Sequence, residues 1–268
     1  MLSTVSAAGQ TDIDADLWAR IDRYVADYFG RTRTIMAREN VRLQPVDRLM
    51  RPEGQSRILS YELRIEWLPA DGTGPIVPSF SRRLIKSMGH LGERSTDREC
   101  FDPTESSVEP LTILLPEHRH EFTFVRAKVR DARPPVVAID YTPVSSKPPE
   151  VVWDDPCGTI SLNDSVRGRI WIHSLTGAVL RVDERLASPY RFAIPKKARE
   201  RRLPDTQTID RLEYSIKYEP VKFRDPEETL LLPKSVRTIS MVDNGVSMLK
   251  LQTFHEYRRF ITGGRVVK

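Results

Sequence analysis

Residues 167–185, RGRIWIHSLTGAVLRVDER, decide the fold of this chain. Apolar and polar side chains alternate on both sides of Thr176-Gly177, and a period of two is typical of β-strands. Gly177 suits the turn, because glycine accepts the positive φ that a tight hairpin needs. The stretch therefore predicts an antiparallel hairpin whose buried face carries four apolar residues: Ile170, Ile172, Leu180 and Val182.

The same alternation predicts further strands along the chain. In residues 57–68, RILSYELRIEWL, the side chains of Leu63, Ile65 and Trp67 share one face, and charged side chains occupy the other. This pattern is typical of an antiparallel sheet with one buried face. Other strands are predicted at 39–46, 110–116, 119–129, 135–143, 210–219, 230–242 and 246–261. Residues 69–108 follow no clear pattern, and their mixed stretch SFSRRLIKSMGHLG could be a strand, a short helix or a lid. Residues 145–166 are expected to form a Pro-rich loop, and 187–206 a basic connection.

One helix is predicted over residues 12–37. Thr11 followed by Asp14 resembles a capping box. Apolar residues then recur at helical spacing, and Gly30 interrupts them with an expected loss of about 1 kcal/mol relative to alanine. The stripe offers either core packing or part of a ligand pocket, and its candidate pocket residues are Leu17, Ile21, Tyr24 and Tyr28.

These elements predict a mainly β fold of the α+β class. About ten strands spaced about 4.8 Å apart would make a flat sheet roughly 48 Å wide. A single helix about 10 Å in diameter cannot cover that face. We therefore expect the sheet to curl around the helix as an unclosed β-barrel and to leave an apolar cavity. Residues 12–268 are expected to form one domain, because no linker separates two cores.

Composition restricts the partners. The chain has 268 residues, a net charge of +5 and a 29% share of charged residues. This mild basicity permits an anionic membrane surface as a partner. The basic cluster at 196–202 lacks the interleaved aromatic residues of a single-strand binder, so nucleic acid is not expected. Residues 1–11 are either a disordered N-terminus or, through Val5-Ser6-Ala7-Ala8, the remnant of a secretory signal.

Catalytic and metal-binding motifs are sparse. There is no Gly-x-Ser-x-Gly, no phosphate-binding loop and no His-Glu-x-x-His. His118 and His120 would share one face of a predicted strand and could bind a metal in a hydrolase, although such a pair is more often a solvated strand end. Cys100 and Cys157 are either two unrelated thiols or a disulfide, which would stabilise the fold by about 3–4 kcal/mol. We expect no catalytic residue, no metal and no cofactor.

The order of elements resembles the LolA/LolB-like superfamily of outer-membrane lipoprotein-sorting proteins, in particular its uncharacterised bacterial envelope branch. The resemblance is carried by the hairpin at 168–181, by Leu-Leu-Pro-Lys-Ser-Val at 231–236 and by the ending Tyr257-Arg258-Arg259-Phe260. Tyr24-Val25 and Ala37-Arg38-Glu39 fit the same pattern. The resemblance covers residues 12–262, and its motifs are motifs of the fold.

This resemblance implies a helical lid over an apolar cavity and a periplasmic location. Relatives hold lipoprotein acyl chains or other lipids, and some act as envelope sensors. The sequence therefore suggests a monomeric, non-enzymatic carrier of a lipid or an acylated protein. The alternative is a sensor or protein-interaction module whose cavity is filled. No motif in 69–108 matches the gate of the lipoprotein carriers.

Overall fold

The computed structural model describes residues 13–32, 34–69, 76–89, 110–128, 135–145, 150–154, 157–161, 165–194, 196, 205–224, 226–243 and 245–259. Within these ranges, the side chains of 65–69, 76–80, 110, 150–154 and 157–161 are not described. The predicted signal remnant and Cys100 lie outside the described residues, so both predictions about them stay untested.

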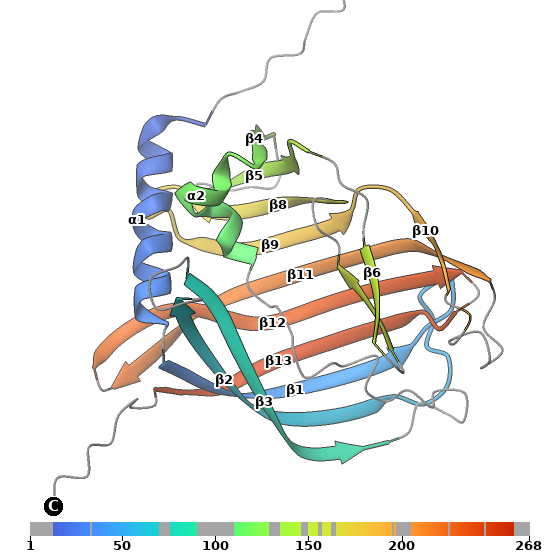
Figure 1. Ribbon diagram of the computed structural model, residues 1–268. Helices are drawn as coiled ribbons and strands as arrows, with labels where there is room; N and C mark the ends of the chain where they lie inside the picture. Colours follow the sequence, from blue (N-terminus) through green and yellow to red (C-terminus); the bar gives the residue numbers. More distant parts are fainter. Residues whose placement is uncertain are drawn as a thin grey trace, which may run out of the picture.

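The described chain folds into a long helix and an eleven-stranded antiparallel sheet (Figure 1). The strand order is β3-β2-β1-β13-β12-β11-β9-β8-β5-β4, with β10 paired to β11. The helical elements are α1 (Ala15–Arg31), the 3-10 helix η1 (Pro110–Leu114) and α2 (Pro116–Arg119). The strands are β1 (Thr34–Pro45), β2 (Arg57–Pro69), β3 (Ile76–Met88), β4 (Phe122–Ala127), β5 (Val136–Pro143), β6 (Glu150–Asp154), β7 (Cys157–Ser161), β8 (Val166–His173), β9 (Val179–Leu186), β10 (Tyr190–Ala193), β11 (Thr206–Arg224), β12 (Glu227–Asp243) and β13 (Met248–Arg259).

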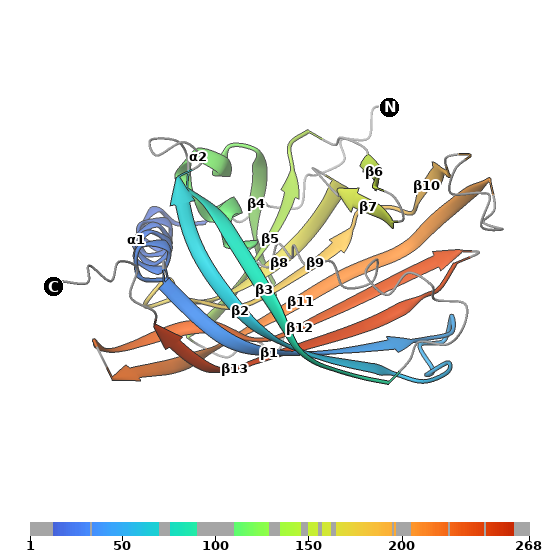
Figure 2. The same ribbon diagram turned by 60° about the horizontal axis from the view of Figure 1, so that its bottom comes forward.

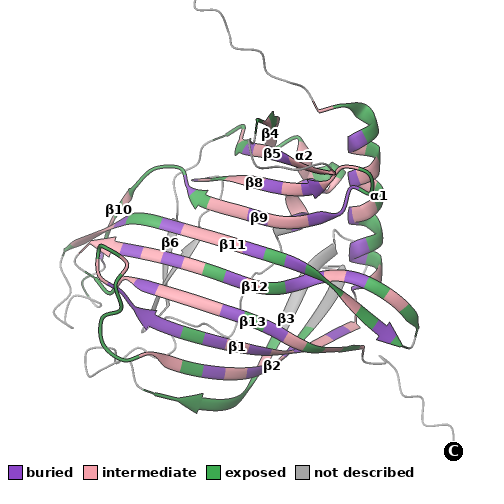
Figure 3. Cartoon of the chain, turned by 180° about the vertical axis from the view of Figure 1, so that it is seen from behind, coloured by how far each residue is buried: buried purple, intermediate pink, exposed green. Residues whose placement is uncertain are grey.

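The mainly β fold is confirmed, but the sheet is neither closed nor strongly curled (Figure 2). The helix α1 lies against one end of the sheet instead of being wrapped by it (Figures 1 and 3). Length explains the difference. A helix of 17 residues is about 25 Å long, whereas the 19 residues of β11 span about 63 Å. One helix can therefore cover only one end of such strands, and we call the face on which it lies the inner face.

The helix is shorter than its predicted range of 12–37. Asp14 is the N-cap, and its carboxylate accepts a hydrogen bond of 2.6 Å from the backbone N–H of Leu17. The helix ends at Arg31, and Thr32 forms the C-cap. The stripe beyond Gly30 belongs to β1, in which every second residue from 35 to 43 is buried. Ile35 fits both the helical and the strand period of apolar residues in the sequence, and in the structure it lies in a strand.

Other expected ranges also require correction. Residues 110–116 are helical instead of extended, because Leu111 and Leu114 are buried at a spacing of three and proline at the start of α2 suits a first helical turn. The unpatterned stretch 69–108 contains β3, the expected loop at 145–166 contains the hairpin β6–β7, and the connection at 187–206 contains β10.

Two charged contacts hold α1 in place. Near its middle, Asp22 accepts a hydrogen bond from the guanidinium of Arg119 on α2, and that guanidinium lies 4.1 Å from the ring centroid of Trp18. At its end, Arg31 donates to Glu228 of β12 at 2.7 and 2.9 Å. Glu228 also accepts from Arg259 of β13, so one carboxylate joins the helix to two strands.

Gly30 offers a direct test of the end of α1. A Cβ atom at this position would have no neighbour within 4 Å, and its φ is not positive. Because glycine in a helix is less favourable than alanine, we expect Gly30→Ala to raise the free energy of unfolding by about 0.5–1 kcal/mol. Urea unfolding followed by circular dichroism measures this, and a destabilised variant would contradict the assigned helix end.

Candidate functional site

Most of the residues predicted to line a cavity meet in one apolar cluster beneath α1, which we call the first inner cluster. Leu17, Ile21 and Tyr28 of the helix pack there with Leu63 of β2 and the hairpin β8–β9. Tyr24 packs against its margin. None of the seven buried candidates is more than 5% exposed; they are Leu17, Ile21, Tyr28, Leu63, Ile170, Ile172 and Val182. These residues meet in a packed core, and their proposed role in binding a ligand stays a prediction.

In the hairpin β8–β9, one predicted residue does not join the first inner cluster. The register shifts between Trp171 and Ile172, so that Ile172 pairs with Val179. As a result Val179 is fully buried in the first inner cluster, whereas Leu180 is only half-buried and does not join it. A bulge of this kind inserts one residue and is not visible in a strictly alternating pattern. The side chains of Ile65, Trp67 and Cys157 lie outside the described part of the structure.

A second apolar cluster lies on the inner face beyond the helix, and we call it the second inner cluster. It is formed by β1, β2 and β13, and its buried members are Val41, Leu43, Leu59, Tyr61 and Met248. None of them belongs to α1, whose buried residues all pack in the first inner cluster. The inner face therefore has a second set of buried apolar residues, to which α1 contributes none.

A buried ion pair separates these two clusters. Glu39 is on the inner face of β1, in phase with Ile35 and Val41, and is 1% exposed. Arg82 of β3, whose side chain is fully buried, donates two hydrogen bonds to its carboxylate at 2.8 and 2.9 Å. Gln252 of β13 donates a third at 2.7 Å, and the guanidinium stacks 4.1 Å from the ring centroid of Tyr61. Three donors and a stacked ring meet the requirements of a charge taken out of water.

Sequence reasoning did not single out Glu39 and Arg82 as site residues. One signal was available, because Glu39 is a carboxylate at a position where the alternation of β1 calls for an apolar residue. Arg82 gave no such signal, since it lies in the stretch 69–108, for which a strand was one of three alternatives.

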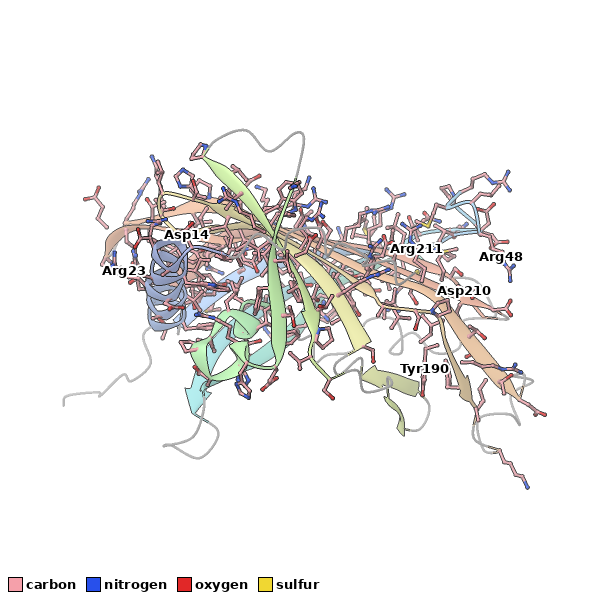
Figure 4. All side chains as sticks on the ribbon, turned by 90° about the horizontal axis from the view of Figure 1, so that it is seen from above. Asp14, Arg23, Arg48, Tyr190, Asp210 and Arg211 are labelled. Carbon is pink, nitrogen blue, oxygen red and sulfur yellow. The ribbon has the colours of Figure 1, made fainter. Side chains whose placement is uncertain are left out.

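A third apolar cluster lies on the same face near β10. Leu186, Ile209 and Leu212 are buried, and three aromatic rings pack around them. Tyr190 and Phe192 of β10 stack with their ring centroids 6.1 Å apart, and Tyr214 of β11 is the third ring. Figure 4 views the sheet edge-on and places Tyr190 on the same side as α2, whereas Arg48 lies on the other side.

A half-buried carboxyl group, that of Glu184, lies between this third cluster and the helix. The ring of Tyr141 packs directly over Gly168. A Cβ atom added at Gly168 would lie 2.3 Å from the Cζ atom of that ring. The hydroxyl of Tyr141 thereby reaches Glu184 on β9 and donates a hydrogen bond to the carboxylate. Burial raises the pKa of Glu184, and the bond from Tyr141 offsets part of that rise. Burial, with the nearby charge of Glu184, raises the pKa of Tyr214 to about 12.

We expect Glu184→Gln to be more stable than the parent protein at pH 8 but not at pH 4. A carboxyl whose pKa is raised on folding binds more protons in the folded state than in the unfolded state. Stability therefore falls as the pH rises above the unfolded value of about 4.3 and through the folded pKa. Glutamine keeps an acceptor for Tyr141 and removes this dependence. Chemical unfolding from pH 4 to 8 measures the difference, and parallel curves for the two proteins would contradict it.

The proposed metal ligands are not arranged as expected. His118 and His120 lie in and directly after the helix α2, so the shared strand face is wrong. His118 is 3.2 Å from Glu121, and no group of three histidine, cysteine or carboxylate side chains suited to a metal occurs among the described residues. In the described ranges, no helix has both the length and the apolar character needed to cross a membrane.

Comparisons with known proteins give a single kind of match. No family model and no curated protein matches the sequence. Among solved structures, the fold is similar to that of a LolA superfamily protein from Nitrosomonas europaea, with 7% sequence identity and a TM-score of 0.39 over 92% of this chain and 96% of the other.

Proposed function

We propose that the protein is a non-enzymatic carrier that holds a hydrophobic ligand, a lipid or the acyl chain of a protein, against the inner face of its sheet. The observation that carries the proposal is the second inner cluster. A core needed only to seat α1 would end at the first inner cluster, yet the buried residues Val41, Leu43 and Leu59 extend the apolar interior past the ion pair.

The energetics suit such a ligand. Each buried methylene contributes about 0.8 kcal/mol, so one long acyl chain contributes on the order of 10 kcal/mol before its ordering is subtracted. No reacting group is needed for this. The proposed location is the periplasm, where a disulfide between Cys100 and Cys157 could form, and an anionic membrane surface is a proposed encounter partner.

The test is direct. Organic extracts of the purified protein would be examined by mass spectrometry, and a fluorescent C16 fatty acid would be titrated into delipidated protein. Leu59→Phe places a larger side chain in the second inner cluster, and we expect it to weaken uptake of the fatty acid at least fivefold. Leu17→Phe makes the same change in the first inner cluster and should leave uptake within twofold. Protein that is empty on isolation and takes up no fatty acid would contradict the proposal.

A second candidate is a sensor or interaction module with a filled interior, and the close packing of the first inner cluster favours it. The two candidates differ in their response to filling the interior. Binding of a protein partner that survives Leu63→Phe and Ile172→Phe, together with no fatty-acid uptake, would support the module.

A further inference from the structure

The outer face of the sheet, opposite α1, carries a hollow with unbalanced positive charge. A cavity of about 880 Å³ is lined by β5, β8, β9, β11, β12 and β13. By strand alternation, the lining residues Arg169 and Trp171 of β8 point away from Ile170, and thus away from the first inner cluster. Tyr141 and Glu184 also contribute to the lining. Figure 3 looks onto this face, and no described helix or strand lies over β8, β9, β11 and β12 there.

The carboxylates of the hollow are already engaged. Asp140 accepts hydrogen bonds of 2.5 and 2.9 Å from Arg169. Asp183 accepts from Arg181 at 2.8 Å and from the indole of Trp171 at 3.1 Å. Glu213 is held by Arg211, which donates two bonds of 2.6 and 2.7 Å.

Four cations of the hollow remain without such a partner. Arg167, Arg185, Lys217 and Arg237 line it and are exposed, and none forms an ion pair within the described part of the chain. Arg167 and Arg185 are directly opposite each other on β8 and β9. Like charges in that arrangement destabilise a sheet, so a bound anion would relieve a repulsion that the free protein carries. Arginine pairs of this kind suit the planar carboxylate group.

We propose that this hollow binds an extended acidic segment of a partner protein. From β5 to β13 it crosses six strands, or about 24 Å, which is the length of about seven extended residues. Trp171 and Leu251 offer apolar contact, and the hydroxyls of Ser215 and Ser235 offer hydrogen bonds between the cations. The hollow also contains carboxylates that are paired with its own arginines. Separate acidic side chains can bind between these carboxylates, whereas the continuous negative surface of an anionic bilayer would be repelled by them. This site is on the other face from the proposed carrier site and does not depend on it.

The test uses the full chain and a fluorescein-labelled eight-residue peptide of alternating glutamate and serine. Fluorescence anisotropy would give its affinity for the parent protein, for R167Q/R185Q and for K222Q/R224Q. The second variant removes two exposed cations of β11 that lie outside the hollow. We expect at least a tenfold loss of affinity for the first, less than a twofold loss for the second, and recovery in R167K/R185K.

Each result has a defined meaning. Equal losses in both double variants would show that only the net charge matters and would overturn the proposal. So would equally tight binding of the matching glutamine-serine peptide. Phosphatidylglycerol vesicles are the remaining arm: binding to them that needs Arg167 and Arg185, with no binding of the peptide, would overturn the acidic segment in favour of a membrane surface.

Discussion

Arg82→Ala is expected to lower the free energy of unfolding by about 3–5 kcal/mol, because it leaves the carboxylate of Glu39 buried without a countercharge. Glu39 is 1% exposed, and after the substitution Gln252 would be the one donor left to it among the described side chains. Equilibrium unfolding in urea, monitored by circular dichroism, measures the loss.

Arg83 supplies the matched control. It is the next residue on β3 and also pairs with a glutamate, Glu62, at 3.0 Å, but its side chain is 74% exposed. Exposed pairs contribute between zero and about 1 kcal/mol, so Arg83→Ala should have a small effect. Equal losses for the two variants would show that the Glu39–Arg82 pair is as solvated as the surface pair.

A reciprocal change separates charge from packing. The double variant E39Q/R82M removes both charges, keeps an acceptor for Gln252 and fills much of the space of the arginine. Because replacing a buried pair by neutral groups of similar size is often close to neutral, we expect it to recover most of the stability that Arg82→Ala loses. A double variant as unstable as Arg82→Ala would mean that lost packing, and not the unpaired carboxylate, causes the effect.

The part of the fold that could be predicted is the part in which local pattern and final environment agree. Ile170 and Ile172 alternate in the sequence and are both buried, and Gly177 forms the turn with φ of 73°. Ile35 shows where pattern alone does not suffice, since it fits a helical stripe and a strand face equally well. The choice between them depends on pairing with β2 and β13, which is a non-local interaction.

The candidate site was predictable to the extent that it is apolar. Leu17, Ile21 and Leu63 converge as expected, because any residue that fits a core pattern must find a core. Glu39 and Arg82 could not be paired from the sequence, since 43 positions separate them and two strands must register before they meet. The bulge that brings Val179 instead of Leu180 into the first inner cluster likewise depends on the partner strand, not on β9 itself.

Gly177→Ala is the second change with a large expected effect. Gly177 is in the turn of the hairpin β8–β9, and its amide donates to the carbonyl of His173 at 2.8 Å. A Cβ there would lie 2.4 Å from the carbonyl carbon and oxygen of Arg20 and 2.6 Å from the backbone nitrogen of Ile21. These atoms belong to the backbone of α1 and cannot turn aside as a side chain would. Strain from the positive φ adds about 1–2 kcal/mol and overpacking about 1–3 kcal/mol, which predicts a loss of about 2–5 kcal/mol.

Gly54 separates the two contributions. Its φ of 76° matches that of Gly177, yet a Cβ at Gly54 would meet nothing within 4 Å. Gly54→Ala should therefore show the backbone strain alone, a loss of about 1–2 kcal/mol. The excess in Gly177→Ala then reports how tightly the turn seats α1, and hydrogen exchange should place it in the amides of that helix. If the two variants lose the same stability, the helix can shift away from the turn freely, and the first inner cluster is looser than its burial indicates.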